Sequence, residues 1–364
     1  MLKRRVLLSS ILGAGCALPA LADTRQYPQL AHPATRLRNL TQLYFVAAAA
    51  AGSRVVAGGE MGVIVTSDDD GQSWHQAQVP VSATITSIAF ASPKVGWATG
   101  ALGVVLNTLD GGQSWVKQLD GTDEIALMNS ATQAYIAAQP PASDSVAHAT
   151  RRAHILTEEG PDKPFLSLLP VSETEVFAFG TYRFAERSTD GGKSWSDWSM
   201  HIGDPSSHNI YGAAAIGGAY YLVSEQGLIF RSTDGGQTFP QLTQVNPSNP
   251  ATLFGIMDTG TGGILAYGVA GEMYLSTDQG KTWNPPAFTG TSNINSVISL
   301  AGGAVLIAGD AGGGLWMSKD HGNSFRLMTR NPIMGINALQ PLRGLRFLIL
   351  SSIGAFPVDL SEMQ

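Results

Sequence analysis

One octapeptide contains most of the side chains in this sequence that could act together chemically. It reads Ser/Thr-x-Asp-x-Gly-x-Ser/Thr-Trp/Phe, so it places a carboxylate between two hydroxyl groups, as both active sites and tight turns can do. Six copies occur, at residues 67–74, 108–115, 188–195, 232–239, 276–283 and 318–325. The choice between catalysis and structure therefore depends on what the repetition means.

The spacing of the copies indicates a repeat architecture. Successive copies are 41, 80, 44, 44 and 42 residues apart, measured between Asp69, Asp110, Asp190, Asp234, Asp278 and Asp320. Repeats of about 40 residues are typical of solenoids and propellers. Three short apolar runs, separated by glycine-rich turns, precede each octapeptide, and its aromatic residue begins a fourth run. This order predicts the four-stranded antiparallel blades of an all-β propeller.

In such a blade the octapeptide is predicted to form the hairpin turn between the third and fourth strands. Its aspartate can accept backbone N–H groups of the turn, its glycine permits positive φ, and its aromatic residue can pack between blades. We therefore assign all six aspartates a structural role. The run Asp68-Asp69-Asp70 lacks the later glutamate of an EF-hand loop, so neither a metal nor a cofactor is expected.

The one long interval predicts an insertion. Between Asp110 and Asp190, residues 120–162 show apolar residues at helical spacing in two runs separated by Pro140-Pro141. We interpret this segment as a helical hairpin between blades 2 and 3. It should overhang the mouth of the central channel.

The C-terminal segment lacks the octapeptide but is predicted to form the last blade. Residues 336–342, 347–351 and 354–358 match three strands of a repeat. The N-terminal segment 24–40 could supply the fourth strand and close the ring. The prediction is seven blades in one domain, residues 23–364.

The N-terminus and the composition indicate an exported protein. Residues 1–22 have three basic residues, an apolar run and an Ala-x-Ala cleavage site, as a signal peptide does, and Arg4-Arg5 leaves twin-arginine export open beside the general route. Removal of this leader changes the net charge from −6 to −9 and removes Cys16, the only cysteine. We expect a periplasmic monomer that binds no nucleic acid, has no membrane span in its mature form, and folds without disulfides.

A site is expected on the face opposite the octapeptides, where the turns between second and third strands lie. That face receives the basic residues of the hairpin together with Tyr182 and Arg183 of the next blade. Two further arginines hold equivalent positions before successive octapeptides and could together hold a carboxylate. The candidate partner-binding residues are Arg151, Arg152, Tyr182, Arg183, Arg187 and Arg231.

Two segments, GWATGALGVVLNTLDGGQSW (residues 96–115) and GLIFRSTDGGQTF (residues 227–239), resemble the photosystem II stability and assembly factor family. The octapeptide resembles the Asp box of that family and of sialidase-type propellers, and we use this name below. The family includes bacterial members from organisms without photosynthesis. The resemblance implies a non-enzymatic seven-bladed propeller that helps a membrane or envelope protein complex to assemble or remain stable.

The enzymatic alternative is an Asp-box glycoside hydrolase such as a sialidase. Sialidases gather three arginines on the face opposite the boxes, whereas only Arg183 lies in the turns of that face here. A pair of carboxylates among Glu60, Glu225 and Asp310 would be needed for another glycosidase. We predict that the protein is not an enzyme.

Overall fold

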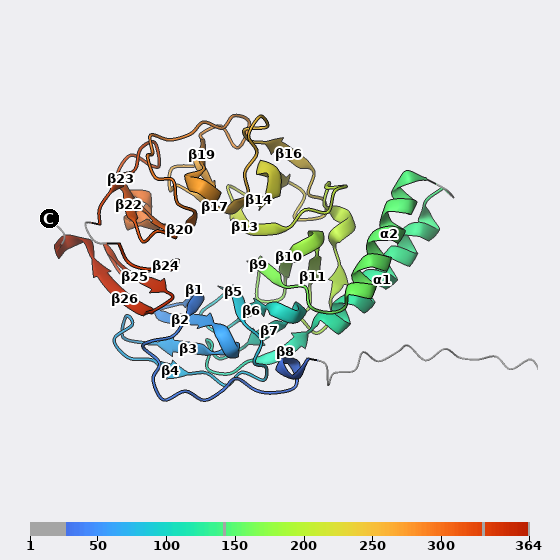
Figure 1. The fold of residues 1–364 in the computed structure, drawn as a ribbon, viewed down its shortest axis with the longest axis horizontal. Helices are drawn as coiled ribbons and strands as arrows, with labels where there is room; N and C mark the ends of the chain where they lie inside the picture. Colours follow the sequence, from blue (N-terminus) through green and yellow to red (C-terminus); the bar gives the residue numbers. More distant parts are fainter. Residues whose placement is uncertain (1–26, 141–142, 330–331, 363–364) are drawn as a thin grey trace, which may run out of the picture.

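The computed structural model describes residues 27–140, 143–329 and 332–362, and the predicted signal peptide lies outside these residues. Within them, antiparallel strands form seven separate sheets arranged as blades around a ring (Figure 1). Five sheets have four strands and two have three. The predicted seven-bladed propeller is confirmed.

Each blade is built from consecutive strands of the chain. Blades 1 to 4 consist of β1 (Phe45–Ala51), β2 (Arg54–Gly59), β3 (Ile64–Ser67), β4 (His75–Gln76); β5 (Ile85–Phe90), β6 (Gly96–Gly100), β7 (Val105–Thr108), β8 (Val116–Leu119); β9 (Phe165–Pro170), β10 (Val176–Gly180), β11 (Ala185–Ser188), β12 (Ser196–Asp197); and β13 (Ile210–Ile216), β14 (Ala219–Ser224), β15 (Leu228–Ser232), β16 (Gln241–Gln244). Blades 5 to 7 consist of β17 (Leu253–Asp258), β18 (Ile264–Gly268), β19 (Met273–Ser276); β20 (Ile294–Leu300), β21 (Val305–Asp310), β22 (Leu315–Ser318), β23 (Arg326–Leu327); and β24 (Ile336–Pro341), β25 (Arg346–Ser351), β26 (Gly354–Asp359).

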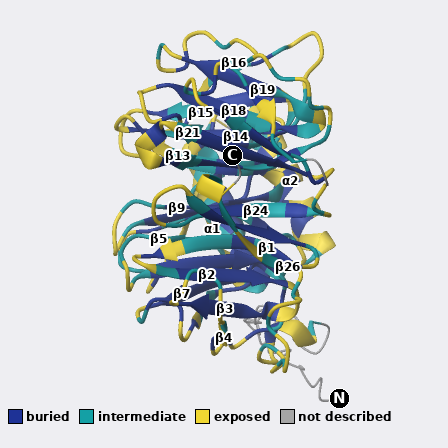
Figure 2. Cartoon of the chain, turned by 90° about the vertical axis from the view of Figure 1, so that its left-hand side faces the viewer, coloured by how far each residue is buried: buried dark blue, intermediate teal, exposed yellow. Residues whose placement is uncertain are grey.

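The core lies between the blades. Seven clusters of buried apolar residues fill the seven interfaces between neighbouring blades, including the one between blades 7 and 1. The inner strands β6 and β10 are buried along their whole length because each has a blade on both sides. Figure 2 shows the buried strands inside the molecule and the exposed turns at its edges.

The Asp boxes form the predicted turns between third and fourth strands. In the box of blade 3, Asp190 Oδ1 accepts the Ser194 backbone N–H at 2.9 Å, and its Oδ2 accepts the Ser194 hydroxyl at 2.6 Å. The Ser188 hydroxyl donates to Asp190 at 2.9 Å and accepts the Gly192 N–H at 2.8 Å. The same carboxylate contacts recur in the other five boxes. These bonds support the structural interpretation of the box.

The insertion contains the two expected helices, α1 (Gly121–Ala138) and α2 (Asp144–Glu159). Ser143 caps α2 by accepting the Val146 N–H, and Gly160 ends it with a φ of 87°. Met128 of α1 and Leu156 of α2 are buried in the cluster between blades 2 and 3. The hairpin therefore shares the propeller core.

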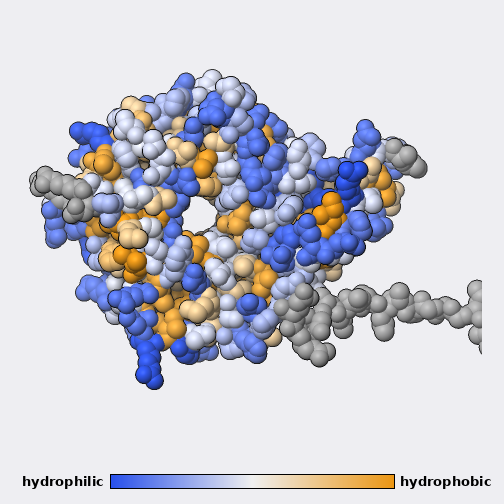
Figure 3. Space-filling model, in the orientation of Figure 1, coloured by the Kyte–Doolittle hydropathy of each residue, from blue (hydrophilic) through white to orange (hydrophobic). Residues whose placement is uncertain are grey.

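The direction of the hairpin differs from the prediction. Figure 1 shows α1 and α2 projecting outward from blades 2 and 3, and Figure 3 shows the opening at the centre of the ring uncovered on this face. The reason is that the buried apolar side chains of both helices pack between blades 2 and 3. This packing holds the hairpin against these two blades and not over the channel. No described helix is both long and apolar enough to cross a membrane.

The closure of the ring also differs from the prediction. In the described part of the chain, the sheet of blade 7 has three strands, and residues 27–40 form no strand beside β26. This segment instead bonds along blade 1 and its connector, where Leu37 N–H donates to Gln76 and Ala34 N–H donates to the Val79 carbonyl. Side-chain packing closes the ring, supported by a 2.8 Å ion pair between Arg346 and Asp70.

Candidate functional site

The helical hairpin meets blade 3 at a junction that collects charged side chains from four elements. Glu124 comes from α1, Arg152 from α2, Glu186 from β11 and Asp197 from the end of β12. Asp120 fixes the first turn of α1, because its side chain accepts the Thr122 N–H in a capping box. The sequence therefore sets the start of the helix that delivers Glu124.

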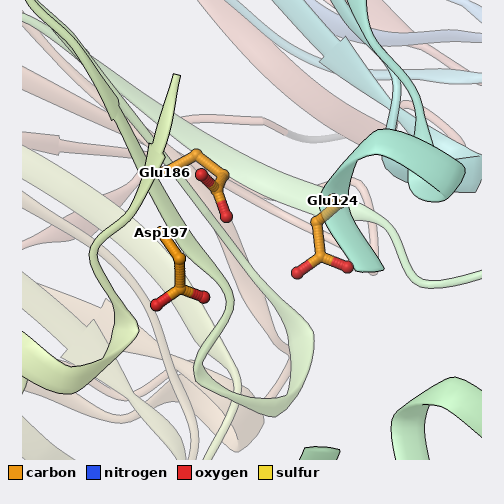
Figure 4. Close-up of side chains that lie close together, drawn as sticks. All are labelled: Glu124, Glu186 and Asp197. Atoms are coloured by element: carbon orange, nitrogen blue, oxygen red, sulfur yellow. The ribbon is translucent and has the colours of Figure 1, made fainter. Parts of the chain in front are cut away.

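Three carboxylates converge at this junction. Glu124, Glu186 and Asp197 each offer an oxygen, and these oxygens lie within 4.8 Å of one another (Figure 4). Glu186 is 0% exposed and Glu124 is 2% exposed. Both oxygens of Glu186, one oxygen of Glu124 and one of Asp197 have no hydrogen-bond partner. Burial raises the pKa of all three carboxyl groups, and repulsion by the neighbouring carboxylates adds to the rise for Glu124 and Glu186.

Arg152 provides the neighbouring positive charge. Its Nε and one terminal nitrogen donate to the Tyr182 carbonyl at 3.2 and 3.0 Å, and its guanidinium lies 5.2 Å from the Phe184 ring centroid. The remaining nitrogen, NH1, has no hydrogen-bond partner. Burial lowers the pKa of Arg152, and the three carboxylates oppose that shift. Arg152 thus links α2 to blade 3 and faces the carboxylates.

The turn at residues 181–183 is backbone-strained beside this junction. Tyr182 and Arg183 both have left-handed backbones, with φ values of 53° and 61°. Arg183 is buried, donates to the Asp204 carbonyl and contacts Met200 Sδ at 3.8 Å. Burial and the nearby Arg152 lower the pKa of Arg183 to about 10. Arg183 holds this conformation where the other five boxed repeats have glycine, and strained non-glycine residues of this kind cluster at functional sites.

A cleft of about 330 Å³ opens between the hairpin and blade 3 next to Arg183. Its lining contains both apolar and polar side chains, and α1 and α2 contribute four of them. Asp204 in its floor bonds the ring of His208 at 3.0 Å and two backbone N–H groups. The lining consists of Tyr135, Ser145, His148, Ala149, Arg183, Met200, Ile202, Gly203, Asp204 and Pro205.

The structure brings together only part of the predicted residue set. Arg152, Tyr182 and Arg183 meet at the junction, but Arg152 and Arg183 are buried rather than displayed, whereas Arg151 and Tyr182 are exposed. Arg152 and Arg183 are therefore not part of an exposed basic surface, because their guanidinium groups turn inward toward carboxylates and carbonyls. A partner-binding role for these four residues stays a prediction.

The two arginines that precede successive boxes do not share a ligand site. Arg187 pairs with Glu175 at 2.6 Å and lies over the Trp198 ring at 4.6 Å. Arg231 lies over the Tyr221 ring at 5.6 Å and donates to the Gln279 carbonyl. Each is held by its own neighbours, and a partner-binding role for either stays a prediction.

Comparison with known proteins identifies the family. A family-wide sequence profile described as Photosynthesis system II assembly factor YCF48 matches residues 66–142 and 162–297, more than half of the chain. The chain belongs to this family. The resemblance seen in the sequence is thereby confirmed.

Known YCF48 proteins are similar in sequence over a short stretch and in fold over most of the chain. Photosystem II assembly lipoprotein Ycf48 of Synechococcus sp. (strain CC9902) is 26% identical over 107 residues, which are 29% of this chain and 32%, about a third, of that relative. YCF48 bound to a D1 peptide is 14% identical over 90% of this chain and 98% of the other, with a TM-score of 0.61. YCF48 from Cyanidioschyzon merolae is 12% identical over the same shares, with a TM-score of 0.62.

The fold is also found in enzymes. A glycoside hydrolase GH74 of Niastella koreensis is 13% identical, with 88% of this chain and 53% of that chain covered and a TM-score of 0.59. At this identity the likeness concerns the fold. The three carboxylates considered for a glycosidase lie in blades 1, 4 and 6, and Asp310 is buried, where it accepts a 2.7 Å bond from the Trp316 indole.

The YCF48 profile leaves out the segment that forms the second helix. Its two matches are separated by residues 143–161, and α2 spans Asp144–Glu159. One wall of the cleft and the guanidinium of the junction therefore come from a part of the chain outside the family pattern.

Sequence reasoning missed the buried carboxylates, although one signal was present. Glu186 stands two residues before its box, where the other five boxed repeats have apolar residues, namely Val65, Leu106, Phe230, Tyr274 and Trp316. Arg183 similarly stands where the other five have Gly62, Gly103, Gly227, Gly271 and Gly313. Blade 3 thus departs twice from the repeat, and both departures lie at the junction.

Proposed function

We propose that this protein is a non-catalytic scaffold that holds a segment of a membrane or envelope protein while that protein is assembled or kept stable. Membership of the YCF48 family supports the assembly role. One structural relative is a YCF48 bound to a D1 peptide, which supports a peptide segment as the ligand. The signal-like residues 1–22 support action outside the cytoplasmic membrane, in the periplasm.

The cleft between α2 and blade 3 is the observation that carries the proposal. Tyr135 and Met200 offer apolar surface, and His148 offers a polar group, a mixture that suits peptide side chains. Its wall belongs to the helix outside the family pattern, which supports a client different from the D1 peptide.

Site-specific photocrosslinking in the native envelope tests this proposal. A photoreactive residue replaces His148, which is exposed in the cleft wall, and the matched control replaces Lys281, which is exposed in the box turn of blade 5. We expect one membrane or exported protein to be crosslinked from position 148 and not from position 281, and its abundance to fall when this gene is deleted. Equal crosslinking from both positions, or none from either, contradicts the proposal.

A charge substitution in the cleft provides the second test. His148→Glu should weaken capture of that client by at least about tenfold, because the new carboxylate lies close to Asp204 at the ligand surface. Lys281→Glu should leave capture unchanged. Arg152 and Arg183 are unsuitable for this test because both are buried. Hydrolysis of aryl glycosides or sialosides by the purified protein would instead support the enzyme alternative.

A further inference from the structure

The buried junction carries an unbalanced charge. Glu124, Glu186 and Asp197 contribute three negative charges when ionised, and Arg152, whose charge acts on all three, contributes one positive charge. Lys163 also acts on Glu124 and Arg183 on Asp197, but each has acceptors of its own. These are the Asp204 carbonyl for Arg183 and the carboxylates of Glu159 and Asp162 for Lys163. With all three carboxylates ionised and Arg152 as the only counter-charge, two negative charges are left uncompensated, and burial raises the pKa of all three groups for this reason.

The polar atoms of the junction also lack partners. Glu186 is fully buried, yet neither of its oxygens accepts a hydrogen bond, and Arg152 NH1 is buried and donates none. Buried polar atoms are nearly always hydrogen-bonded, and a structural salt-bridge network would satisfy them directly. Unpartnered carboxylate oxygens that converge from α1, β11 and β12 indicate that a ligand belongs between them.

We propose that Glu124, Glu186 and Asp197 bind one hard divalent cation, with calcium as the best fit. The donors are all oxygens, which favours calcium, magnesium or manganese over zinc or copper. The three oxygens lie within 4.8 Å of one another, so one ion can reach all of them. Three protein carboxylates favour calcium, because magnesium usually keeps several waters and is bound by only one or two carboxylates. One such ion supplies the two missing charges.

This cation has a definite mechanical effect. It joins the first turn of α1 to the outer strands of blade 3, and Arg152 beside it joins α2 to the turn at residues 181–183. Binding should hold the hairpin against the propeller. The cation site stands independently of the proposed function, because it does not require that the cleft binds a client.

Calorimetric titration of the chelator-treated full protein with calcium, magnesium and manganese chlorides tests the proposal. We expect one calcium ion per chain to bind more tightly than magnesium, and the Tm to rise by about 4 °C or more at saturating calcium. Hydrogen exchange in residues 121–159 should slow when calcium is added. The proposal is wrong if no divalent ion binds at millimolar concentration and chelation leaves the Tm unchanged.

Isosteric variants locate the site. Glu186→Gln removes a ligand charge with little change of shape and should abolish the calcium-dependent rise in Tm, whereas Glu60→Gln, an exposed carboxylate of blade 1, should retain it. Glu124→Gln and Asp197→Asn serve as alternatives if Glu186→Gln does not fold. Calcium binding that survives in every folded variant would place the ion elsewhere and overturn the assignment.

Discussion

The aspartate of each box stabilises its own turn by accepting hydrogen bonds from residues of the same box. Asp69, Asp190 and Asp278 have pKa values lowered to about 2 by hydrogen bonds from the second hydroxyl residue of their boxes. The bonds stay within eight residues, which explains why the role of the box could be predicted from sequence. The groups that bond to the aspartate lie at most four residues away in the chain, so the motif itself specifies them.

Replacement of one box aspartate should destabilise one turn. In Asp190→Ala, the backbone N–H of Ser194 and the hydroxyls of Ser188 and Ser194 lose their acceptor. Since these groups are partly solvated, we expect the Tm to fall by about 2–4 °C. Differential scanning calorimetry measures this, and capture of the client should not change.

Acid should weaken the boxes between about pH 4 and pH 2. An aspartate has a pKa of about 3.9 in the unfolded chain, and Asp69, Asp190 and Asp278 have folded values of about 2. Their stabilisation is therefore complete above about pH 4 and is lost as the pH falls toward 2. The carboxyl groups with raised pKa values, Glu124, Glu186 and Asp197, act in the opposite direction near pH 4, because there only their unfolded form still gains protons. Urea titrations at each pH give this slope, and an unchanged free energy of unfolding from pH 4 to 2 would contradict the expectation.

At the scale of elements, the turns between second and third strands share an unusual backbone. The middle residue is left-handed in blades 1 to 5 although none is glycine, as at Met61, Leu102, Tyr182, Gln226 and Ala270. The following residue is also left-handed, and it is glycine in all of these turns except that of blade 3. The turn geometry is set by the repeat, and Arg183 adopts it at an energetic cost.

Two neighbouring residues allow a clean test of this turn. Ala270→Gly removes a left-handed side chain of one methyl group and should stabilise the fold by about 1 kcal/mol. Gly271→Ala should destabilise it by more than about 2 kcal/mol, because φ is +79° and the new Cβ would lie 2.2 Å from the Gly290 carbonyl oxygen. Chemical denaturation of both variants measures the contrast. Equal effects would mean that the backbone does not determine stability here.

The hairpin should behave as part of the core. Leu156 is 1% exposed between α2 and the propeller, whereas Ile155 beside it is 43% exposed. Leu156→Ala should cost about 2–5 kcal/mol through the cavity it leaves, and Ile155→Ala less than about 0.5 kcal/mol. Denaturant unfolding compares them. Similar losses would indicate a hairpin that is not docked as described.

At the scale of the whole molecule, sequence periodicity predicted the ring but not its charged junction. The 80-residue step located the two helices because helical spacing is visible in one chain segment. The junction combines residues 124, 152, 186 and 197 through the packing of α1 and α2 between blades, and no spacing rule relates these positions. The same packing explains why Arg152 turned out to be buried and why the hairpin points outward.

No described blade combines strands from both ends of the chain. The fold should therefore be kept when the termini are moved to another connector between blades. A circular permutant that begins at Ser248, in the exposed connector after blade 4, keeps every blade contiguous. A glycine-serine linker of about 25 residues would join the old ends. We expect one cooperative unfolding transition with a Tm within about 10 °C of the parent, measured by calorimetry. Two separate transitions would show that the original ends are needed.

The packed seam between blades 7 and 1 has a further consequence. No connector of the described chain crosses it, in contrast to the other six interfaces, so only Asp70, Arg346 and the surrounding apolar residues hold the first blade to the last. Under tension applied at the termini this seam bears the load first. Blade 7 should then separate from blade 1 and open the ring, while the other blades stay packed against their neighbours.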